Sequence, residues 1–344
     1  MWGSRWRALL LAMAVVAAVA MVAAGCGDDD DDGGGDSGDG EGELVGLVSD
    51  IGKFSDRSFN QSALEGMTRA EEEFGVMGRP IESVAASDYI PNLTTLARQD
   101  AAVTIGVGFL MAEALTTVAG QFPDNDFAIV DFPQAALEGM PSNVRGLNFA
   151  TNENSYLVGY MAAKMAERAG GKQVISAVGG EKLPSVTIFM AGYTAGAKAA
   201  NPDVQVLINY SQDFVAQDKC KELALNQIQK GSQVVFQVAG GCGLGALDAA
   251  RERGVWGIGV DRDQSDLGGH ILTSAVKRVD TSVFDTIKAA TEGNFEGGDV
   301  NFNLANEGVA VGTTSPEVPQ ELLDEIDGLR QQIIDGELEV PAAL

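Results

Sequence analysis

Short apolar runs rich in valine and isoleucine alternate, from residue 44 onward, with stretches whose apolar residues recur at helical spacing. Runs of the first kind are typical of buried strands, and stretches of the second kind are typical of amphipathic helices. Strands that alternate with helices in this way predict parallel sheets covered by helices. The pattern predicts strands at residues 44–49, 81–85, 102–107, 127–131, 173–178, 204–209, 233–238, 255–260 and 271–275.

The length of this alternating region predicts two lobes. It spans roughly 300 residues, more than one hydrophobic core usually serves, and chains of this size commonly divide into two domains. We therefore expect an α/β fold with two doubly wound lobes.

The segment that follows the first predicted strand has the pattern of a helix start. Ser58 is followed three residues later by Gln61, which is the spacing of a capping box. Gly75, a residue typical of helix ends, closes the segment. The apolar residues that recur at helical spacing between these signals, and that predict a face packed on a sheet, are Phe59, Ala63, Met67, Ala70 and Phe74.

Loops that leave the carboxyl ends of parallel strands are where open α/β sheets bind ligands, because unpaired backbone N–H groups of the next helix point outward there. Candidate binding residues are therefore expected in these loops. The polar and aromatic loops of this chain that fall at such ends are 49–60, 106–109, 131–132, 211–214, 239–245 and 261–264.

The first 26 residues have the order of a secretory signal. Arg5 and Arg7 precede an uncharged apolar run at residues 8–24, and Gly25 and Cys26 follow it. The run of 17 residues is at the lower edge of what spans a hydrocarbon core of ~30 Å, so a retained membrane helix is the weaker interpretation. The segment VAAGC at 22–26 resembles a bacterial lipobox, which makes Cys26 the expected lipidated first residue of the mature protein. The alternative is an ordinary cleaved signal with an unrelated cysteine.

Residues 27–42 consist of glycine, aspartate, serine and glutamate, with no apolar residue that could join a core. Such a segment is expected to be a disordered, self-repelling tether that holds the folded part away from the bilayer. Nothing in it fixes a coordination geometry, so the aspartate run is not expected to bind a metal.

The chain is strongly acidic, with 23 lysine and arginine residues against 49 aspartate and glutamate residues and a net charge of −26. Without Arg5, Arg7 and the nine acids from Asp28 to Glu43, the remaining residues still carry −19. This charge repels phosphate backbones, so nucleic acid is not expected as a partner. It also disfavours direct binding to anionic lipid, which leaves the acyl chain as the expected membrane attachment.

Two cysteines remain once Cys26 is assigned to lipid. An exported protein resides where disulfides form, and Cys220 and Cys242 could meet at one end of a sheet. Two separate buried thiols are the alternative, because a disulfide needs Cα atoms within ~7 Å of each other. Both interpretations stay open at this point.

Eight motifs, taken in order along the chain, resemble those of the basic membrane protein family of substrate-binding lipoproteins. They are LVSDIG (47–52) with DRSFNQ (56–61), GVGF (106–109), FPD (122–124) with FAIVD (127–131), ENSYLVG (153–159), FQVAGG (236–241) and WGIGVDRDQ (256–264). The resemblance covers almost the whole chain, and the combination is specific although each motif alone is weak.

The resemblance implies a type I periplasmic-binding-protein fold, with two α/β lobes joined by three crossovers and a ligand enclosed at the hinge. The expected organisation is a signal peptide at 1–25, a tether at 26–43, a first lobe at 44–148 plus about 276–312, and a second lobe at 149–275 plus about 313–344. The expected function is capture of a purine nucleoside for an ABC importer, with a permease and an ATPase as partners. No enzymatic activity, cofactor or metal is expected.

The resemblance also implies a role for each of eight residues in binding the nucleoside. Phe59 and Phe214 sandwich the base, and Asp50 and Asn60 meet the base or the hinge side of the ribose. Asp131 contacts the base edge, Asp261 and Lys277 hold the ribose hydroxyls, and Gly240 allows close backbone approach. These roles suit the ligand, because aromatic rings stack on a base and a carboxylate accepts hydrogen bonds from a diol while an ammonium donates back.

Three of these residues have structural alternatives. Phe59 could be a core residue at a helix start, Asp131 could cap the next segment, and Lys277 could be a surface lysine next to Arg278. Phe214 is the stronger ligand candidate because its neighbours are polar. The chain also departs from the family pattern at Lys53, where a glycine is usual, and at the two cysteines, where small residues are usual.

Rival functions find less support. The segment GCGLGA at 241–246, with Asp261 beyond it, has the spacing of a dinucleotide-binding fingerprint, but the export signal and the late position argue against a nicotinamide enzyme. His270 stands alone before a strand, and no serine-hydrolase motif accompanies it. A ligand-sensing surface receptor for another small polar ligand remains an alternative that the sequence does not separate from transport.

Overall fold

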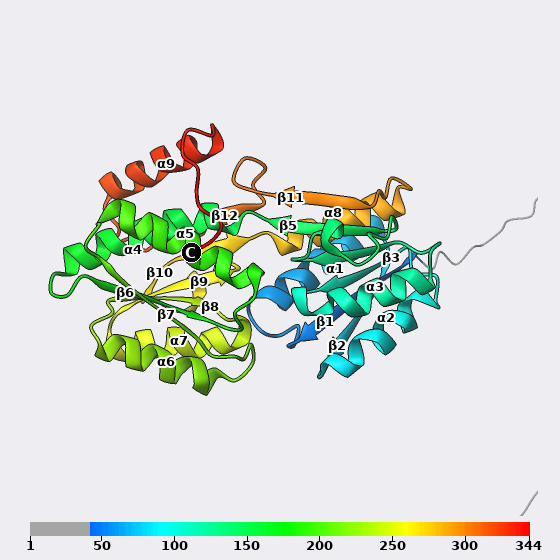
Figure 1. Cartoon of the computed structure of the whole chain (residues 1–344), viewed down its shortest axis with the longest axis horizontal. Helices are drawn as coiled ribbons and strands as arrows, with labels where there is room; N and C mark the ends of the chain where they lie inside the picture. Colours follow the sequence, from blue (N-terminus) through cyan, green and yellow to red (C-terminus); the bar gives the residue numbers. More distant parts are fainter. Residues whose placement is uncertain (1–41) are drawn as a thin grey trace, which may run out of the picture. The chain divides into compact units, whose positions relative to one another are not determined.

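The structure is a computed structural model that describes residues 42–344 (Figure 1). The expected signal peptide and the lipidation at Cys26 lie outside the described residues, as does almost all of the expected tether. The described part contains two six-stranded sheets. No helix in this part is long and apolar enough to cross a membrane.

The strands of the first sheet run, in spatial order, β2 (Met77–Ser83), β1 (Leu44–Ile51), β3 (Val103–Val107), β4 (Phe127–Val130), β5 (Val144–Phe149) and β11 (Gly298–Phe302). Those of the second sheet run β7 (Gln205–Tyr210), β6 (Val174–Gly179), β8 (Val234–Val238), β9 (Trp256–Asp261), β10 (Ile271–Lys277) and β12 (Val309–Val311). All neighbours are parallel except β10 and β12. The two sheets therefore repeat one strand order.

Helices cover both faces of each sheet (Figure 1). The first sheet lies between one pair, α1 (Phe59–Phe74) and α8 (Val279–Thr291), and another, α2 (Tyr89–Ala97) and α3 (Ala112–Gln121). On the second sheet, α4 (Thr151–Ala169) and α5 (Pro184–Ala200) pack together opposite α6 (Gln217–Gln229) and α7 (Gly240–Arg253), and α9 (Gln320–Ile334) packs on α4.

The chain passes between the sheets three times, from β5 to α4, from β10 to α8 and from β11 to β12. The predicted fold class is confirmed, with two doubly wound lobes joined by three crossovers. The last crossover differs slightly from expectation. Val309–Val311 pairs with β10 in the second sheet, whereas the expected boundaries assign residues up to about 312 to the first lobe.

All nine predicted strands are present, but three others were missed. β5 carries the polar Arg145 and Asn148 among its buried residues, which breaks its apolar run. β11 is an edge strand with mostly exposed side chains, and β12 has three residues. β2 starts earlier than predicted, at Met77, because as an edge strand it tolerates Pro80 and exposed polar residues.

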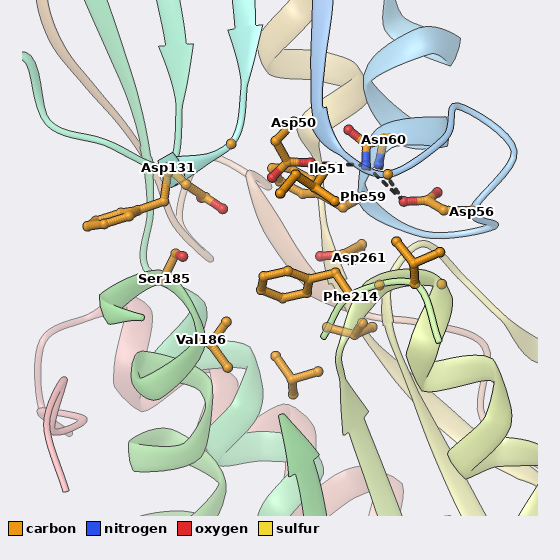
Figure 2. A pocket seen from close by; sticks show the side chains of 18 of the residues that line it. Asp50, Ile51, Asp56, Phe59, Asn60, Asp131, Ser185, Val186, Phe214 and Asp261 are labelled. Atoms are coloured by element: carbon orange, nitrogen blue, oxygen red, sulfur yellow. Dashed lines mark hydrogen bonds between the residues drawn. The ribbon is translucent and has the colours of Figure 1, made fainter. Parts of the chain in front are cut away.

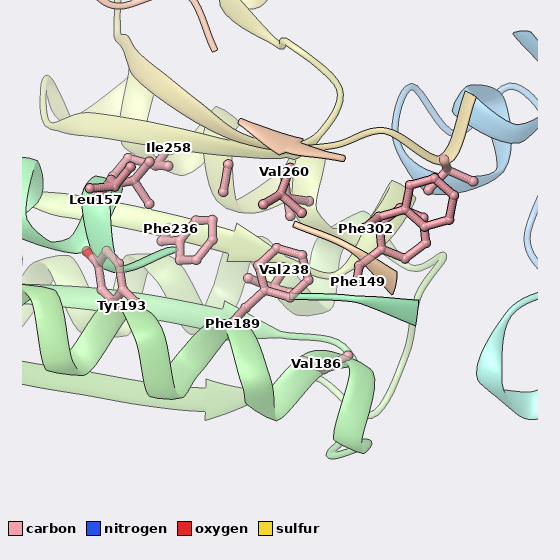
Figure 3. Close-up of a cluster of buried hydrophobic side chains, with 14 of the residues drawn as sticks. Phe149, Leu157, Val186, Phe189, Tyr193, Phe236, Val238, Ile258, Val260 and Phe302 are labelled. Carbon is pink, nitrogen blue, oxygen red and sulfur yellow. The ribbon is translucent and has the colours of Figure 1, made fainter. Parts of the chain in front are cut away.

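The core of the second lobe places α5 beside the cleft between the lobes (Figure 3). Tyr193 and Phe189 of α5 pack on Phe236 of β8, with ring centroids 5.0 Å and 6.2 Å apart. On its other side α5 closely approaches α4, and a Cβ on Gly192 would lie 2.1 Å from the Asn152 carbonyl oxygen. This packing fixes where the first turn of α5 meets the cleft.

The start of α1 corrects one detail of the predicted cap. The Ser58 side chain makes no cap hydrogen bond. Instead the Asp56 carboxylate accepts from the backbone N–H groups of Ser58, Asn60 and Gln61, at 2.8, 3.0 and 3.1 Å. A carboxylate placed on these otherwise unpaired N–H groups also suits the positive end of the helix dipole. The Ser58 hydroxyl is thereby free to bond elsewhere. As predicted, α1 ends at Gly75, which is left-handed with φ of 69°.

Candidate functional site

A cavity of about 210 Å³ lies where the carboxyl ends of the two sheets face each other (Figure 2). One water molecule needs ~10–15 Å³ of such space, so the cavity has room for a small organic molecule. All eight residues that the family resemblance implies line it, namely Asp50, Phe59, Asn60, Asp131, Phe214, Gly240, Asp261 and Lys277. Whether they bind a ligand stays a prediction.

Asp50 is the last residue but one of β1. It lines the cavity and is only 9% exposed. Burial raises the pKa of this carboxyl to about 8. The Asn60 amide opposes the rise with a long hydrogen bond of 3.4 Å, whereas the carboxyls of Asp56, Asp131 and Glu181 add to it. Asp50 is therefore mostly protonated at neutral pH.

Asp131 and Lys277 form a buried ion pair in the cavity wall. The Lys277 ammonium lies 2.5 Å from an Asp131 carboxylate oxygen, and the lysine side chain is 2% exposed. The ammonium also faces the rings of Phe59 and Phe149, 4.7 Å and 4.9 Å from their centroids. Lys277 is thus not a surface lysine, and Asp131 caps no helix. Because a buried charge is costly when unpaired, each of these groups depends on the other.

Asp261 lies at the end of β9 and contacts the first lobe. Its carboxylate accepts a hydrogen bond of 2.5 Å from the Ser58 hydroxyl, whereas the Lys277 ammonium bonds to Asp131. Burial raises the pKa of Asp261 to about 6, while the nearby Lys277 ammonium and the Ser58 hydroxyl hold the rise back. The expected roles of Asp261 and Lys277 toward a ribose stay predictions.

Two aromatic side chains line the cavity from opposite lobes. Figure 2 shows Phe59, at the start of α1, on the side of the first lobe and Phe214, in the loop before α6, on the side of the second. The Phe214 ring lies against Gly180, where a Cβ would come within 2.2 Å of it. The carbonyl of Phe214 accepts from the Cys242 N–H at 2.9 Å, so its backbone is held by α7.

Cys220 and Cys242 are joined by a disulfide, with Cα atoms 5.6 Å apart. The bond links the first turns of α6 and α7, and Cys242 lies in the helix and not in the loop before it. Both turns border the cavity, through Gln217 of α6 and through Gly240, Gly241 and Leu244 of α7. The disulfide thus fastens together two segments of the cavity wall.

The glycines of the 241–246 segment serve close packing. A Cβ on Gly243 would lie 1.7 Å from the Gln237 side-chain oxygen, and one on Gly245 would lie 1.9 Å from the Gln217 carbonyl oxygen. These contacts let α7 approach β8 and α6. The spacing that suggested a dinucleotide fingerprint is explained by this packing.

Sequence reasoning missed the apolar wall that the second lobe contributes. Val186 and Phe189 of α5, Val238, Leu244 and Val260 all line the cavity. A signal for part of it was present, because Pro184 follows the predicted strand at 173–178 and proline is typical of the first position of a helix. The roles of Ser58 and Asp56 were missed as well. Within residues 42–344 no cluster of three or more histidine, cysteine, aspartate or glutamate side chains could hold a metal ion.

Comparisons with known proteins agree with this architecture. A family model described as "ABC transporter substrate-binding protein PnrA-like" matches residues 44–343. The chain is 35% identical over 320 residues to a CD4+ T-cell-stimulating antigen of Listeria monocytogenes, covering 86% of this chain and 87% of that protein. It is 34% identical over 319 residues to the ABC transporter nucleoside-binding protein BmpA of Lactococcus lactis, covering 86% and 88%. The crystal structure of an ABC transporter solute-binding protein from Aeropyrum pernix matches with a TM-score of 0.80 at 28% identity, covering 87% of this chain and 94% of that one.

Proposed function

The chain belongs to the PnrA-like family of ABC transporter substrate-binding proteins, and on that premise we propose that it captures a purine nucleoside outside the cytoplasm for an ABC importer. The observation that carries the proposal is the content of one cavity: two aromatic rings from opposite lobes beside a buried group of two carboxylates and one ammonium. The nucleoside-binding relative in Lactococcus lactis supports the same ligand class.

Each part of a nucleoside has a complementary group in the cavity. The base presents two flat faces, on which Phe59 and Phe214 stack for ~1–3 kcal/mol per base. The ribose presents two neighbouring hydroxyls, which donate to the Asp261 carboxylate and accept from the Lys277 ammonium. A ligand that replaces water here also keeps these buried charges hydrogen-bonded, which is the condition for their being tolerated.

The working step is closure of the lobes around the ligand. A ligand favours closure only by contacting both lobes at once, because a conformational equilibrium shifts by the difference in affinity for its two states. Several direct bonds already join the lobes at the cavity edge: Ser58 to Asp261, the Gln264 amide to the Arg57 carbonyl at 2.9 Å, and the Arg262 guanidinium to Glu65. These bonds would have to break for the lobes to separate at this edge.

Attachment to the membrane completes the proposal. We assign residues 1–25 to a signal peptide, Cys26 to lipidation and the acidic segment at 26–43 to a tether, so that the lobes stay near the permease. The ligand is released to the permease unchanged, with the permease and its ATPase as partners. The lobes are assigned as 44–148 plus about 276–308 and 149–275 plus about 309–344, the last boundary moved to follow the pairing of β12.

The test is direct identification of the ligand. The full chain is expressed in a bacterial host, the processed protein is purified in detergent, and the small molecules released on denaturation are identified by mass spectrometry. The released molecule is expected to be a purine nucleoside. Calorimetry then compares inosine, guanosine and adenosine with uridine and ribose. Tight binding of ribose alone, or of uridine in preference to every purine nucleoside, would contradict the proposal.

A further inference from the structure

Asp50 is an enclosed acid of the cavity wall that has no cationic partner. It ends β1, lines the cavity and is nearly buried, and no ion pair within the described residues includes it. Its side-chain partner is the Asn60 amide, at the long distance of 3.4 Å. The loop after β3 closes over it, because Gly108, with φ of 124°, comes so near that a Cβ there would lie 2.3 Å from an Asp50 oxygen.

The groups that face Asp50 make a negative charge on it costly. The carboxyls of Asp56 from its own loop, Asp131 from the end of β4 and Glu181 from the second lobe all surround it. On the α2 side lies the buried phenol of Tyr89, whose pKa is raised by burial and by the nearby Asp50 carboxyl. Lys277, the buried ammonium of the cavity, is bonded to Asp131.

A buried carboxylate with acid neighbours and no cation takes up a proton, because an isolated charge in the interior costs far more than protonation does. Burial is also the main cause of the pKa of about 8 for Asp50. The neutral form has one O–H donor, and the Asn60 group that lies near it is an amide N–H₂, itself a donor. The Asn60 Nδ2 group therefore does not accept the proton of Asp50.

We propose that Asp50 works as a neutral carboxylic acid that donates a hydrogen bond to an acceptor atom of the bound ligand, and so determines which ligands fit. The inference rests on the proposed function and specifies it further. A purine ring offers unprotonated nitrogens on its edges as acceptors, and the charged form of Asp50 would instead face their lone pairs. A phosphorylated ligand would add negative charge beside four carboxyls, so the same geometry favours nucleosides over nucleotides.

The test uses Asp50→Asn, which keeps the shape and a donor but cannot ionise. Calorimetry measures the Kd of inosine and of adenosine for the full protein and the variant, from about pH 6 to about pH 9.5. Each pH profile is taken relative to the Kd of the same protein at pH 6. As the pH rises through the pKa of Asp50, the Kd of the wild type is expected to rise about tenfold per pH unit, while that of the variant changes only through ionisation of the ligand itself.

Two further measurements separate this role from a purely structural one. Glu181→Gln removes one of the acids that raise the pKa of Asp50, so it is expected to move the onset of the pH dependence to lower pH and to leave the Kd at pH 6 unchanged within a few-fold. Calorimetry of the wild type in buffers of different ionisation enthalpy is expected to show net proton uptake on binding near pH 9, which Asp50→Asn abolishes.

Two outcomes would contradict the inference alone, and a third would contradict the proposed function as well. Coinciding pH profiles for wild type and Asp50→Asn, or a Kd for Asp50→Asn more than about 100-fold higher at pH 6 in a variant with unchanged circular dichroism, would overturn the inference and leave the nucleoside receptor intact. Failure of the wild type to bind any purine nucleoside at pH 6 would overturn the proposed function and the inference with it.

Discussion

The two lobes share one strand order, and equivalent positions of the two sheets meet at the cavity. β4 of the first sheet corresponds to β9 of the second, and each delivers an aspartate in the left-handed region: Asp131 with φ of 71° and Asp261 with φ of 63°. The third strands correspond as well, and each is followed by a glycine of positive φ, Gly108 and Gly240. A non-glycine residue rarely adopts such a φ, so its occurrence at both equivalent positions marks a shared device for aiming a carboxylate into the cleft.

The chemistry placed on this common scaffold differs between the lobes. The first lobe contributes most of the acids and the Asn60 amide, whereas the second contributes an apolar wall that includes Val186, Phe189 and Leu244. Lys277, at the end of the strand that crosses between the lobes, lies beside both equivalent aspartates. The strand order that the two sheets share thus sets where the side chains enter the site. The residue types make the first lobe's side polar and the second lobe's side largely apolar, with the Lys277 ammonium between them.

Removing that ammonium is expected to have the largest effect. In Lys277→Met the Asp131 carboxylate stays buried without a partner, so the free energy of unfolding at pH 7 should fall by ~3–5 kcal/mol. The loss should be smaller near pH 5. The ammonium holds down the pKa of Asp261, so in the variant the folded-state pKa of Asp261 rises further above its unfolded value. The variant therefore loses stability as the pH rises through this folded-state pKa. Urea denaturation at both pH values measures the difference.

The matched control is Lys164→Met, which removes a partly exposed ammonium 3.6 Å from Glu325 in the second lobe. Its effect should stay below ~1 kcal/mol. A loss at Lys277 no larger than that of this control would mean that the two aspartates do not depend on a shared cation.

Breaking the disulfide tests the second lobe alone, because the first lobe contains no cysteine. Replacing both Cys220 and Cys242 by alanine should lower the free energy of unfolding by about 3 kcal/mol, since the bond closes a loop between residues 22 apart in sequence. Nucleoside affinity should fall too, because the Cys242 N–H holds the Phe214 backbone. Reduced wild type serves as the control and should match the variant in urea denaturation. Unchanged stability in both would show that packing alone holds α6 against α7.

The fold was predictable because it depends on the hydrophobic pattern: apolar runs located the strands, and strand ends located the loops in which open α/β sheets bind ligands. The individual candidate residues came from the family resemblance, and their contact with a ligand stays a prediction. The strands missed are those whose stability depends on neighbours more than on their own residues: β5 with its polar positions, and β11 and β12 at the edges. Edge strands carry too weak an alternation for a single sequence to reveal them.

The contacts within the site could not be predicted in the same way. The acid that bonds directly to Lys277 was not predictable, because Asp131 and Asp261 occupy equivalent positions in the two lobes and only three-dimensional distances decide between them. The Ser58 hydroxyl was likewise expected to cap α1. In the structure the Asp56 carboxylate caps the helix, and the Ser58 hydroxyl donates to Asp261 of the other lobe. Local sequence patterns indicate which polar groups a segment offers. Which groups bond to each other depends on contacts between residues more than 140 positions apart in the sequence.

Truncating the aromatic wall of the second lobe should have a smaller effect than either change above, and one confined to binding. Phe214→Ala is expected to raise the Kd for a purine nucleoside about 10- to 100-fold, because stacking on a base contributes ~1–3 kcal/mol. Calorimetry at pH 6 measures it. Phe295→Ala is the control, since this ring packs against Arg145 outside the cavity and its loss should not change the Kd. An unchanged Kd in Phe214→Ala would remove Phe214 from the site.

The smallest effect on binding is expected from breaking the partly exposed ion pair between Arg262 and Glu65, which joins the two lobes. The Arg262 guanidinium donates to the Glu65 carboxylate at 2.7 Å across the cavity edge, and both side chains are partly exposed. Exposed ion pairs contribute ~0–1 kcal/mol, so Arg262→Gln should raise the nucleoside Kd no more than about fivefold by favouring the open form.

Salt should cancel this effect of Arg262→Gln, because at 1 M the screening length is about 3 Å. Calorimetry of wild type, Arg262→Gln, Glu65→Gln and the double variant, at low and high salt, isolates the pair. An interaction energy above ~2 kcal/mol that persists at high salt would contradict the expectation that this exposed pair contributes little to closure.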